Sequence, residues 1–200
     1  MRLLKLLLVL FVYAAGPAVA GPFEDATAAY NQGDYTTALR LWRPLAEQGD
    51  ASAQYNLGFI YYSGLGVPQD TAAAVSWYRK AADQGYAGAQ AVLSFMFEKG
   101  LGVTQDYAAA ASWCRKAAEQ GHAVALYNLG LMYATGQGVT RDYVQAHKWF
   151  NLAAAQFEAS SKEKRETAIK NLNVVAAGMT SAQIAEAQKL AREWKPKTQR

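Results

Sequence analysis

The feature that most constrains this chain is a repeat of 36 residues that occurs three times without a gap. The same positions in each copy hold an alanine, a leucine, two glycines, a valine, an aspartate and a tryptophan. A fourth, partial copy precedes them within residues 21–50. Self-similarity at such a period is typical of solenoids, in which each unit packs only on its neighbours. The three full copies are 51–86, 87–122 and 123–158.

Each copy is expected to form a helix, a loop and a second helix. In the first copy, apolar residues at helical spacing predict helices over 51–63 and 71–84. Gly64 suits a left-handed C-terminal position, since it has no Cβ, and Asp70 suits the N-cap of the second helix. The sequence therefore predicts an all-α superhelix of stacked helix pairs.

The repeated residues identify a family likeness. They are an Ala-x-x-x-Leu-Gly-x-x-Tyr core at 53–61, the loop Gly64-Leu65-Gly66-Val67, Asp70, and the segment 77–82. This pattern resembles the Sel1-like repeat family, a relative of the tetratricopeptide repeats, over residues 23–158. Two positions depart from it: Ser94 replaces a glycine and is expected to loosen the helix contact there. Phe157 replaces the terminal glycine, so the last helix is expected to run past 158.

The two ends read as caps for the solenoid, whose terminal repeats would otherwise expose apolar faces. Residues 21–50 form a partial repeat, and residues 159–200 form capping helices and a basic tail. Thr180 and Gln183 have the spacing of a capping box. Residues 161–200 carry nine basic and four acidic side chains, whereas residues 21–160 carry nine and twelve. We interpret this mild asymmetry as a solvated face rather than as a site for anions.

Residues 1–20 have the layout of a secretory signal peptide. Arg2 and Lys5 precede an apolar run of about ten residues, and Ala18-Val19-Ala20 offers a cleavage site. A membrane span needs roughly 20 apolar residues, so this run is too short to be one. We expect cleavage after Ala20 and a mature chain that is periplasmic or secreted. One cysteine, Cys114, fits an oxidising compartment.

No motif for catalysis, a metal or a cofactor stands out in the sequence. The Gly-x-Gly loops lack the preceding strand and the lysine of a phosphate-binding loop. His122 and His147 have no metal-ligand spacing. Cys114 occupies a position held by Tyr78 and Phe150 in the other copies, so we expect a core residue and not a nucleophile. Without residues 1–20 the net charge is +2, which does not indicate nucleic-acid binding.

The leading hypothesis is an exported scaffold without enzymatic activity. Members of the Sel1-like family generally serve as adaptors, so the resemblance implies a peptide or protein partner, of the cell envelope, in the concave groove. By comparison with tetratricopeptide repeats, the first helix of each pair lines that groove. The alternative is a cell-envelope hydrolase of the β-lactamase or penicillin-binding Sel1-like type, although those relatives carry cysteine pairs that this chain lacks. The expected groove residues are Tyr55, Phe59, Tyr62, Phe95, Glu98, Lys99, Tyr127 and Leu131.

Overall fold

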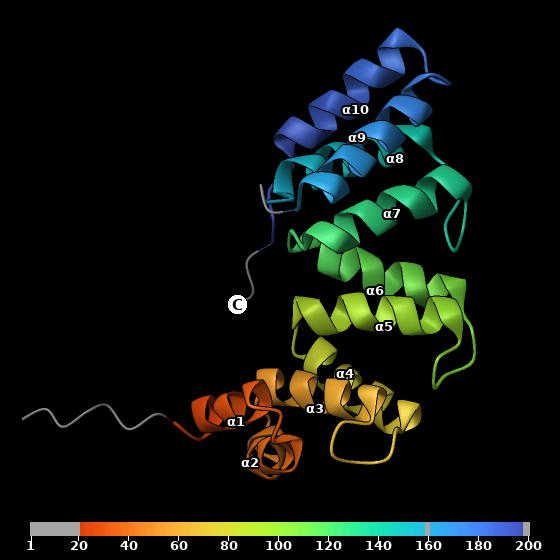
Figure 1. Ribbon diagram of the computed structural model, residues 1–200. Helices are drawn as coiled ribbons and strands as arrows, with labels where there is room; N and C mark the ends of the chain where they lie inside the picture. Colours follow the sequence, from red (N-terminus) through yellow and green to blue (C-terminus); the bar gives the residue numbers. More distant parts are fainter. Residues whose placement is uncertain (1–20, 159–160, 198–200) are drawn as a thin grey trace, which may run out of the picture.

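The computed structural model describes residues 21–158 and 161–197, and this part of the chain folds into ten α-helices in consecutive pairs. The pairs stack into an elongated array with α1 and α2 at one end and α9 and α10 at the other (Figure 1). The expected all-α superhelix of stacked helix pairs is confirmed. The helices are α1 (Pro22–Asn31), α2 (Tyr35–Glu47), α3 (Ala51–Ser63), α4 (Thr71–Asp83), α5 (Ala87–Lys99), α6 (Tyr107–Glu119), α7 (Ala123–Thr135), α8 (Tyr143–Gln156), α9 (Lys162–Ala176) and α10 (Ser181–Glu193).

The loop residues set the helix ends as expected. Gly64 closes α3 in the left-handed region, with φ of 67°, and Gly100 and Gly136 do the same for α5 and α7. The Asp70 carboxylate accepts a hydrogen bond from the Ala73 N–H at 2.8 Å, which caps α4. Asp106 caps α6 in the same way. In each repeat, a glycine therefore ends the first helix and an aspartate caps the second.

Helix pairs approach closely where the first helix carries a glycine. A Cβ added to Gly58 would lie 2.8 Å from the ring of Tyr78, and one added to Gly130 would lie 2.7 Å from Phe150. Larger side chains at these two positions would therefore collide with the partner helix.

The middle repeat has a different pair of side chains at this helix contact. Ser94 is 3% exposed and lies against Cys114, whose small side chain leaves room for the serine. The expected loosening at Ser94 is therefore not observed: the larger residue on α5 is balanced by a smaller one on α6.

A ladder of glutamine side chains connects successive repeats. The Gln54 amide donates to the Ala46 carbonyl at 2.9 Å and accepts from Gln84 at 2.7 Å. Gln90 and Gln120 repeat the arrangement one unit later, at 2.8 Å. Gln54 and Gln90 are each 4% exposed, so these bonds satisfy polar groups that burial would otherwise penalise.

The C-terminal end departs from the repeat. α8 ends at Gln156, and Phe157 adopts an extended conformation and packs against the core, so the expected helix past 158 is wrong. An apolar side chain can leave the helix here because its burial compensates the lost helical bonds. α9 and α10 both pack on α8. Thr180 and Gln183 form the expected capping box at the start of α10.

The segment after α10 returns along the array. The Trp194 ring meets Trp149 edge-on, with centroids 6.3 Å apart. The Lys197 backbone N–H donates to the Glu119 carbonyl at 2.8 Å, and its ammonium pairs with the Glu119 carboxylate at 2.7 Å. Among the described residues, no helix has the length and apolar character needed to cross a bilayer. The expected signal peptide, residues 1–20, lies outside the described residues.

Candidate functional site

Three hollows follow one another along the first helices of the pairs. The first lies between α1 and α3, has a volume of about 310 Å³, and is lined by Thr27, Tyr30, Asn31, Trp42, Tyr55, Asn56 and Phe59. The second, also about 310 Å³, involves α3, α5 and α7 and is lined by Tyr55, Gly88, Ala91, Val92, Phe95, His122, Val124 and Asn128. The third, about 370 Å³, lies between α7 and α9 and is lined by Val124, Tyr127, Asn128, Phe157, Glu163, Lys164 and Thr167.

Shared walls connect the three hollows. Tyr55 belongs to the first and second, and Val124 and Asn128 belong to the second and third. We call this continuous surface over α1, α3, α5, α7 and α9 the first-helix groove. The helices that line it follow one another along the stacking direction of the array (Figure 1).

Two phenylalanines contribute accessible apolar surface to the groove. Phe59 is 37% exposed and Phe95 is 43% exposed. The Phe59 ring meets Tyr30 of α1 edge-on at 6.2 Å. Tyr55 lies between the rings of Tyr78 and Tyr86, and its burial raises the pKa of its phenol. The first two hollows therefore combine fixed rings with two phenylalanines open to solvent.

The structure places four of the eight expected groove residues in these hollows: Tyr55, Phe59, Phe95 and Tyr127. The Tyr127 hydroxyl already accepts a hydrogen bond from the Asn171 amide of α9 at 2.8 Å. Leu131 packs with Leu172 of α9 on the cluster that contains Phe150. Tyr62 packs on the core cluster of α4 and α5.

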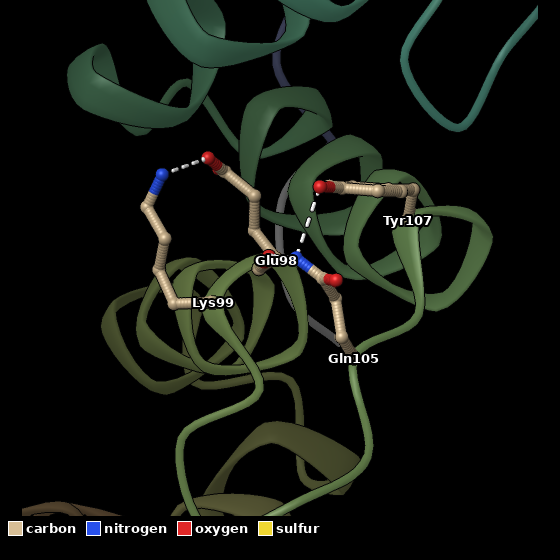
Figure 2. A network of polar contacts seen from close by, with 4 residues as sticks. All are labelled: Glu98, Lys99, Gln105 and Tyr107. Carbon is tan, nitrogen blue, oxygen red and sulfur yellow. Dashed lines mark hydrogen bonds and ion pairs between the residues drawn. The ribbon is translucent and has the colours of Figure 1, made fainter.

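The remaining two expected residues, Glu98 and Lys99, belong to a polar network at the end of α5 (Figure 2). The Lys99 ammonium pairs with the Glu98 carboxylate at 2.6 Å, and this bond raises the pKa of Lys99. The Gln105 amide donates to the Glu98 carbonyl at 2.7 Å and to the Tyr107 hydroxyl at 2.9 Å. These contacts connect α5 to its loop, and neither charged residue lines any of the three hollows.

Two asparagines in the groove were missed by the sequence reasoning. Asn56 of α3 and Asn128 of α7 occupy the same repeat position, where α5 has Val92. Both are half-buried and line hollows, and neither amide has a hydrogen-bond partner among the described residues. Their recurrence at the same repeat position was the signal available in the sequence.

The groove carries little charge. Arg, Lys, Asp and Glu are absent from the walls of the first two hollows, and the third has Glu163 and Lys164. His122 lines the second hollow and caps α7 through its Nδ1, which accepts from the Ala125 N–H at 3.3 Å. Partial burial lowers the pKa of His122, which favours the neutral ring needed for this bond. The structure half-buries His122 at the start of α7.

The reactive side chains outside the groove are enclosed. Cys114 has no exposed surface, its thiol donates to the Ala125 carbonyl at 3.3 Å, and burial raises its pKa to about 12. His147 is 2% exposed, and burial lowers its pKa. No group of three or more His, Cys, Asp or Glu side chains suited to a metal occurs within residues 21–158 and 161–197.

A further hollow of about 260 Å³ lies on the second-helix side, between α6 and the loop before α8. Its charged residues already have partners. Arg115 donates to the Tyr133 hydroxyl at 2.8 Å, and the Lys116 ammonium lies 3.9 Å from the Trp113 ring centroid. Glu119 holds Lys197. This hollow therefore offers less unused polar capacity than the first-helix groove.

Comparison with known proteins gives a consistent family relationship. The Sel1 repeat model matches residues 29–50, 51–86, 87–122 and 123–156. A crystal structure described as a protective antigen of uropathogenic Escherichia coli with an SLR fold is similar, with 37% identity and a TM-score of 0.73. That alignment covers 86% of this chain but only 37% of the antigen's chain.

A Sel1 repeat protein from Oxalobacter formigenes is also similar, with 28% identity and a TM-score of 0.67. That alignment covers 84% of this chain and 74% of the other. No curated protein matches the sequence.

Proposed function

The chain belongs to the Sel1 repeat family, and from this premise we propose that it is a non-enzymatic scaffold that binds an extended segment of a partner protein in the first-helix groove. The observation that carries the proposal is the continuity of the three hollows through Tyr55, Val124 and Asn128. A continuous groove suits an extended chain better than a compact small molecule, which one closed pocket would enclose.

The groove's side chains support a polypeptide ligand. Exposed aromatic rings such as Phe59 and Phe95 are residue types that often dominate binding energy at interfaces. The amides of Asn56 and Asn128 each offer a donor and an acceptor, which is the pairing that a peptide main chain requires. The low charge of the first two hollows favours an apolar, uncharged segment, because an unpaired charge buried there would be costly.

The titratable groups favour binding over the alternative of a cell-envelope hydrolase. A thiol with a pKa of about 12 is almost wholly protonated at neutral pH, so Cys114 supplies no thiolate nucleophile. His147 is enclosed, and the Nδ1 of His122 accepts the capping hydrogen bond, which argues against either ring as a general base. A direct test of β-lactam hydrolysis by the purified protein would decide this point.

We place this scaffold in the periplasm or outside the cell, with residues 1–20 removed after Ala20. The support is the sequence of that segment, which combines a basic start, a short apolar run and small residues before the cut. Sequencing the N-terminus of the exported protein should yield Gly21-Pro22-Phe23. A product that retains Met1 in the cytoplasm would contradict this assignment.

The groove is tested by site-specific cross-linking in cells. A photoreactive residue at Phe95 should cross-link to a partner, because this side chain is 43% exposed within the second hollow. The matched control is Tyr107, an aromatic residue that is 38% exposed but lies at the loop edge of α6.

An alanine pair provides the second arm of this test. Phe59→Ala with Phe95→Ala should abolish capture of the partner found by cross-linking, with about 1–3 kcal/mol of affinity lost for each ring. Tyr107→Ala should leave capture unchanged. Equal cross-linking at both positions, or capture by the folded double variant, would exclude the groove as the binding surface.

A further inference from the structure

Two ring nitrogens in the walls of the first-helix groove act only as hydrogen-bond donors. Trp42 lines the first hollow, and its buried indole N–H has no acceptor among the described residues. His122 lines the second hollow, and its Nδ1 accepts from the Ala125 N–H. Because a neutral imidazole carries one hydrogen, this bond places that hydrogen on Nε2, which is therefore a donor.

The phenols and amides of the groove add further hydrogens. The Tyr55 hydroxyl, whose pKa is raised by burial, stays protonated and has no partner within the described chain. The Tyr127 oxygen accepts from the Asn171 amide, which leaves its own O–H free to donate. Asn56 and Asn128 each carry two amide hydrogens and one oxygen. Free hydrogens therefore exceed free acceptor atoms along the groove.

Acceptors are scarce in the same walls. The first two hollows contain no carboxylate, and Glu163 contributes to the third only. Carbonyl groups inside the lining helices are used by helical hydrogen bonds, so the remaining acceptors are the oxygens of amides and hydroxyls. A complementary ligand must supply acceptors and bring few donors of its own, because a donor buried without a partner is costly.

A proline-rich segment has this composition. Each proline keeps its main-chain carbonyl but has no N–H, so the segment brings acceptors without donors. Its polyproline II conformation is populated before binding, which lowers the entropic cost of ordering it. An ordinary peptide brings one N–H for each carbonyl, and the hydroxyls of a neutral glycan donate as well as accept. Both would bury more donors than this groove satisfies.

The aromatic side chains of the groove suit proline rings. Phe59 and Phe95 occupy the same repeat position on α3 and α5, and they are 37% and 43% exposed. In the first hollow, the Tyr30 ring is inclined by 72° to Phe59 and by 43° to Trp42. These rings therefore form a corner rather than a flat surface. Grooves lined by aromatic rings are a recurrent means of binding polyproline II segments.

We propose that the segment bound in the first-helix groove is proline-rich and uncharged, with its carbonyl oxygens on the donors and its rings on the two phenylalanines. This inference rests on the proposed binding function and specifies the class of its ligand. The two remain separable: a partner cross-linked at Phe95 through a segment without proline would overturn this inference and leave the groove as the binding surface.

Calorimetric titration of the purified mature protein with a capped peptide of roughly twelve prolines, about 37 Å long in this conformation, tests the proposal. Alanine at alternate positions restores a main-chain N–H at each of them and should weaken the affinity about tenfold. N-methylalanine at the same positions removes these N–H groups again and should recover most of the loss. Equal affinity for the alanine and N-methylalanine peptides would overturn the proposal, since the main-chain hydrogens would then have no effect.

Substitutions of the groove amides provide the second arm of the test. Asn56→Leu with Asn128→Leu should lower the affinity for the proline peptide about tenfold, because the amide donors are lost. Val92→Asn adds an amide at the equivalent position of α5 and should raise it. Asn151→Leu is the matched control, since Asn151 of α8 is also half-buried but lines none of the three hollows, and it should have no effect.

Three results would overturn the proposal. The first is no binding of the proline peptide. The second is binding that the two groove asparagines do not affect. The third is tighter binding of a neutral oligosaccharide, chitotetraose, than of the proline peptide, because that result would assign the donors of the groove to a glycan.

Discussion

One position of the first helix holds glycine or serine, and this residue determines how large a side chain the second helix can carry opposite it. Gly58 has room only for its hydrogen, because Tyr78 would meet a Cβ at 2.8 Å. Ser94 occupies the same repeat position and is tolerated because Cys114 stands where the other repeats have a ring. The chain's single cysteine therefore has a packing explanation that requires no thiol chemistry.

This exchange predicts a coupled pair of substitutions. Cys114→Tyr alone should destabilise the fold by about 1–3 kcal/mol, because the new ring overlaps Ser94. Adding Ser94→Gly should restore most of that loss by recreating the pair seen in the neighbouring repeats. Urea unfolding of both single variants and the double variant gives the coupling energy. Additive effects would show that residues 94 and 114 do not share this space.

The two histidines predict that acid weakens the fold. Burial lowers the pKa of His122 and of His147 below 6.5, so the unfolded chain binds protons more readily than the folded one. Their neutral forms therefore stabilise the fold fully above pH 6.5, and this contribution is lost as the pH falls from 6.5 through the lower folded pKa values.

Urea midpoints at about pH 7.5 and pH 5 measure the effect. His147→Val with His122→Asn should reduce the drop, since valine occupies the equivalent position at Val75 and asparagine caps a helix without titrating. A drop of the same size in this double variant would assign the pH dependence to other groups.

At the scale of helices, the sequence predicted most boundaries to within one residue, because each capping residue appears in three copies. The predictions for 51–63 and 71–84 correspond to α3 and α4. The error at the end of α8 has a physical cause: Phe157 gains more from packing on the core than from continuing a helix. Spacing along one chain does not reveal such tertiary competition.

The contacts between helices were harder to predict from the sequence. The bond from Gln84 to Gln54 and the pairing of Ser94 with Cys114 depend on which side chains meet across two helices. Their recurrence at 36 residues was visible in the sequence, but their partners were not. The same reason explains why Leu131 was assigned to an open groove although it packs with Leu172 of α9.

The packing of α10 predicts that deleting this helix destabilises the fold more than removing the single contact of Lys197 does. Deleting residues 179–200 should lower the melting temperature and promote aggregation, because it uncovers Trp149 and the apolar surface under Ala187 and Ala191. Lys197→Ala removes only an exposed ion pair and should cost no more than about 1 kcal/mol. Thermal unfolding and light scattering compare the two variants. If the deletion variant is soluble and equally stable, α10 is a segment available to partners and not a structural cap.

At the scale of the whole molecule, stability is distributed along a line. Each helix pair contacts the pairs before and after it, so the fold has no single central core on which every helix depends. The groove has the same property, since each of its hollows is built by adjacent repeats. The family pattern predicted where the groove runs, whereas its connected hollows depend on side-chain volumes that only the assembled array determines.

In a linear array, a substitution in the middle is also expected to uncouple the unfolding of the two halves. Trp113 of α6 is half-buried and packs back on the cluster formed by α4 and α5, with Lys116 over its ring. Trp113→Ala should cost about 2 kcal/mol, less than the ~3–5 kcal/mol typical of a fully buried tryptophan. Because the lost contact joins the two halves, hydrogen exchange should show that residues before 100 and after 107 open with different free energies.

Trp149→Ala is the matched control. This ring is 5% exposed, so the loss of stability should be larger, but the substitution should loosen the C-terminal end and leave the middle of the array coupled. A single cooperative opening in the Trp113→Ala protein, at unchanged stability, would show that this ring does not hold the repeats together.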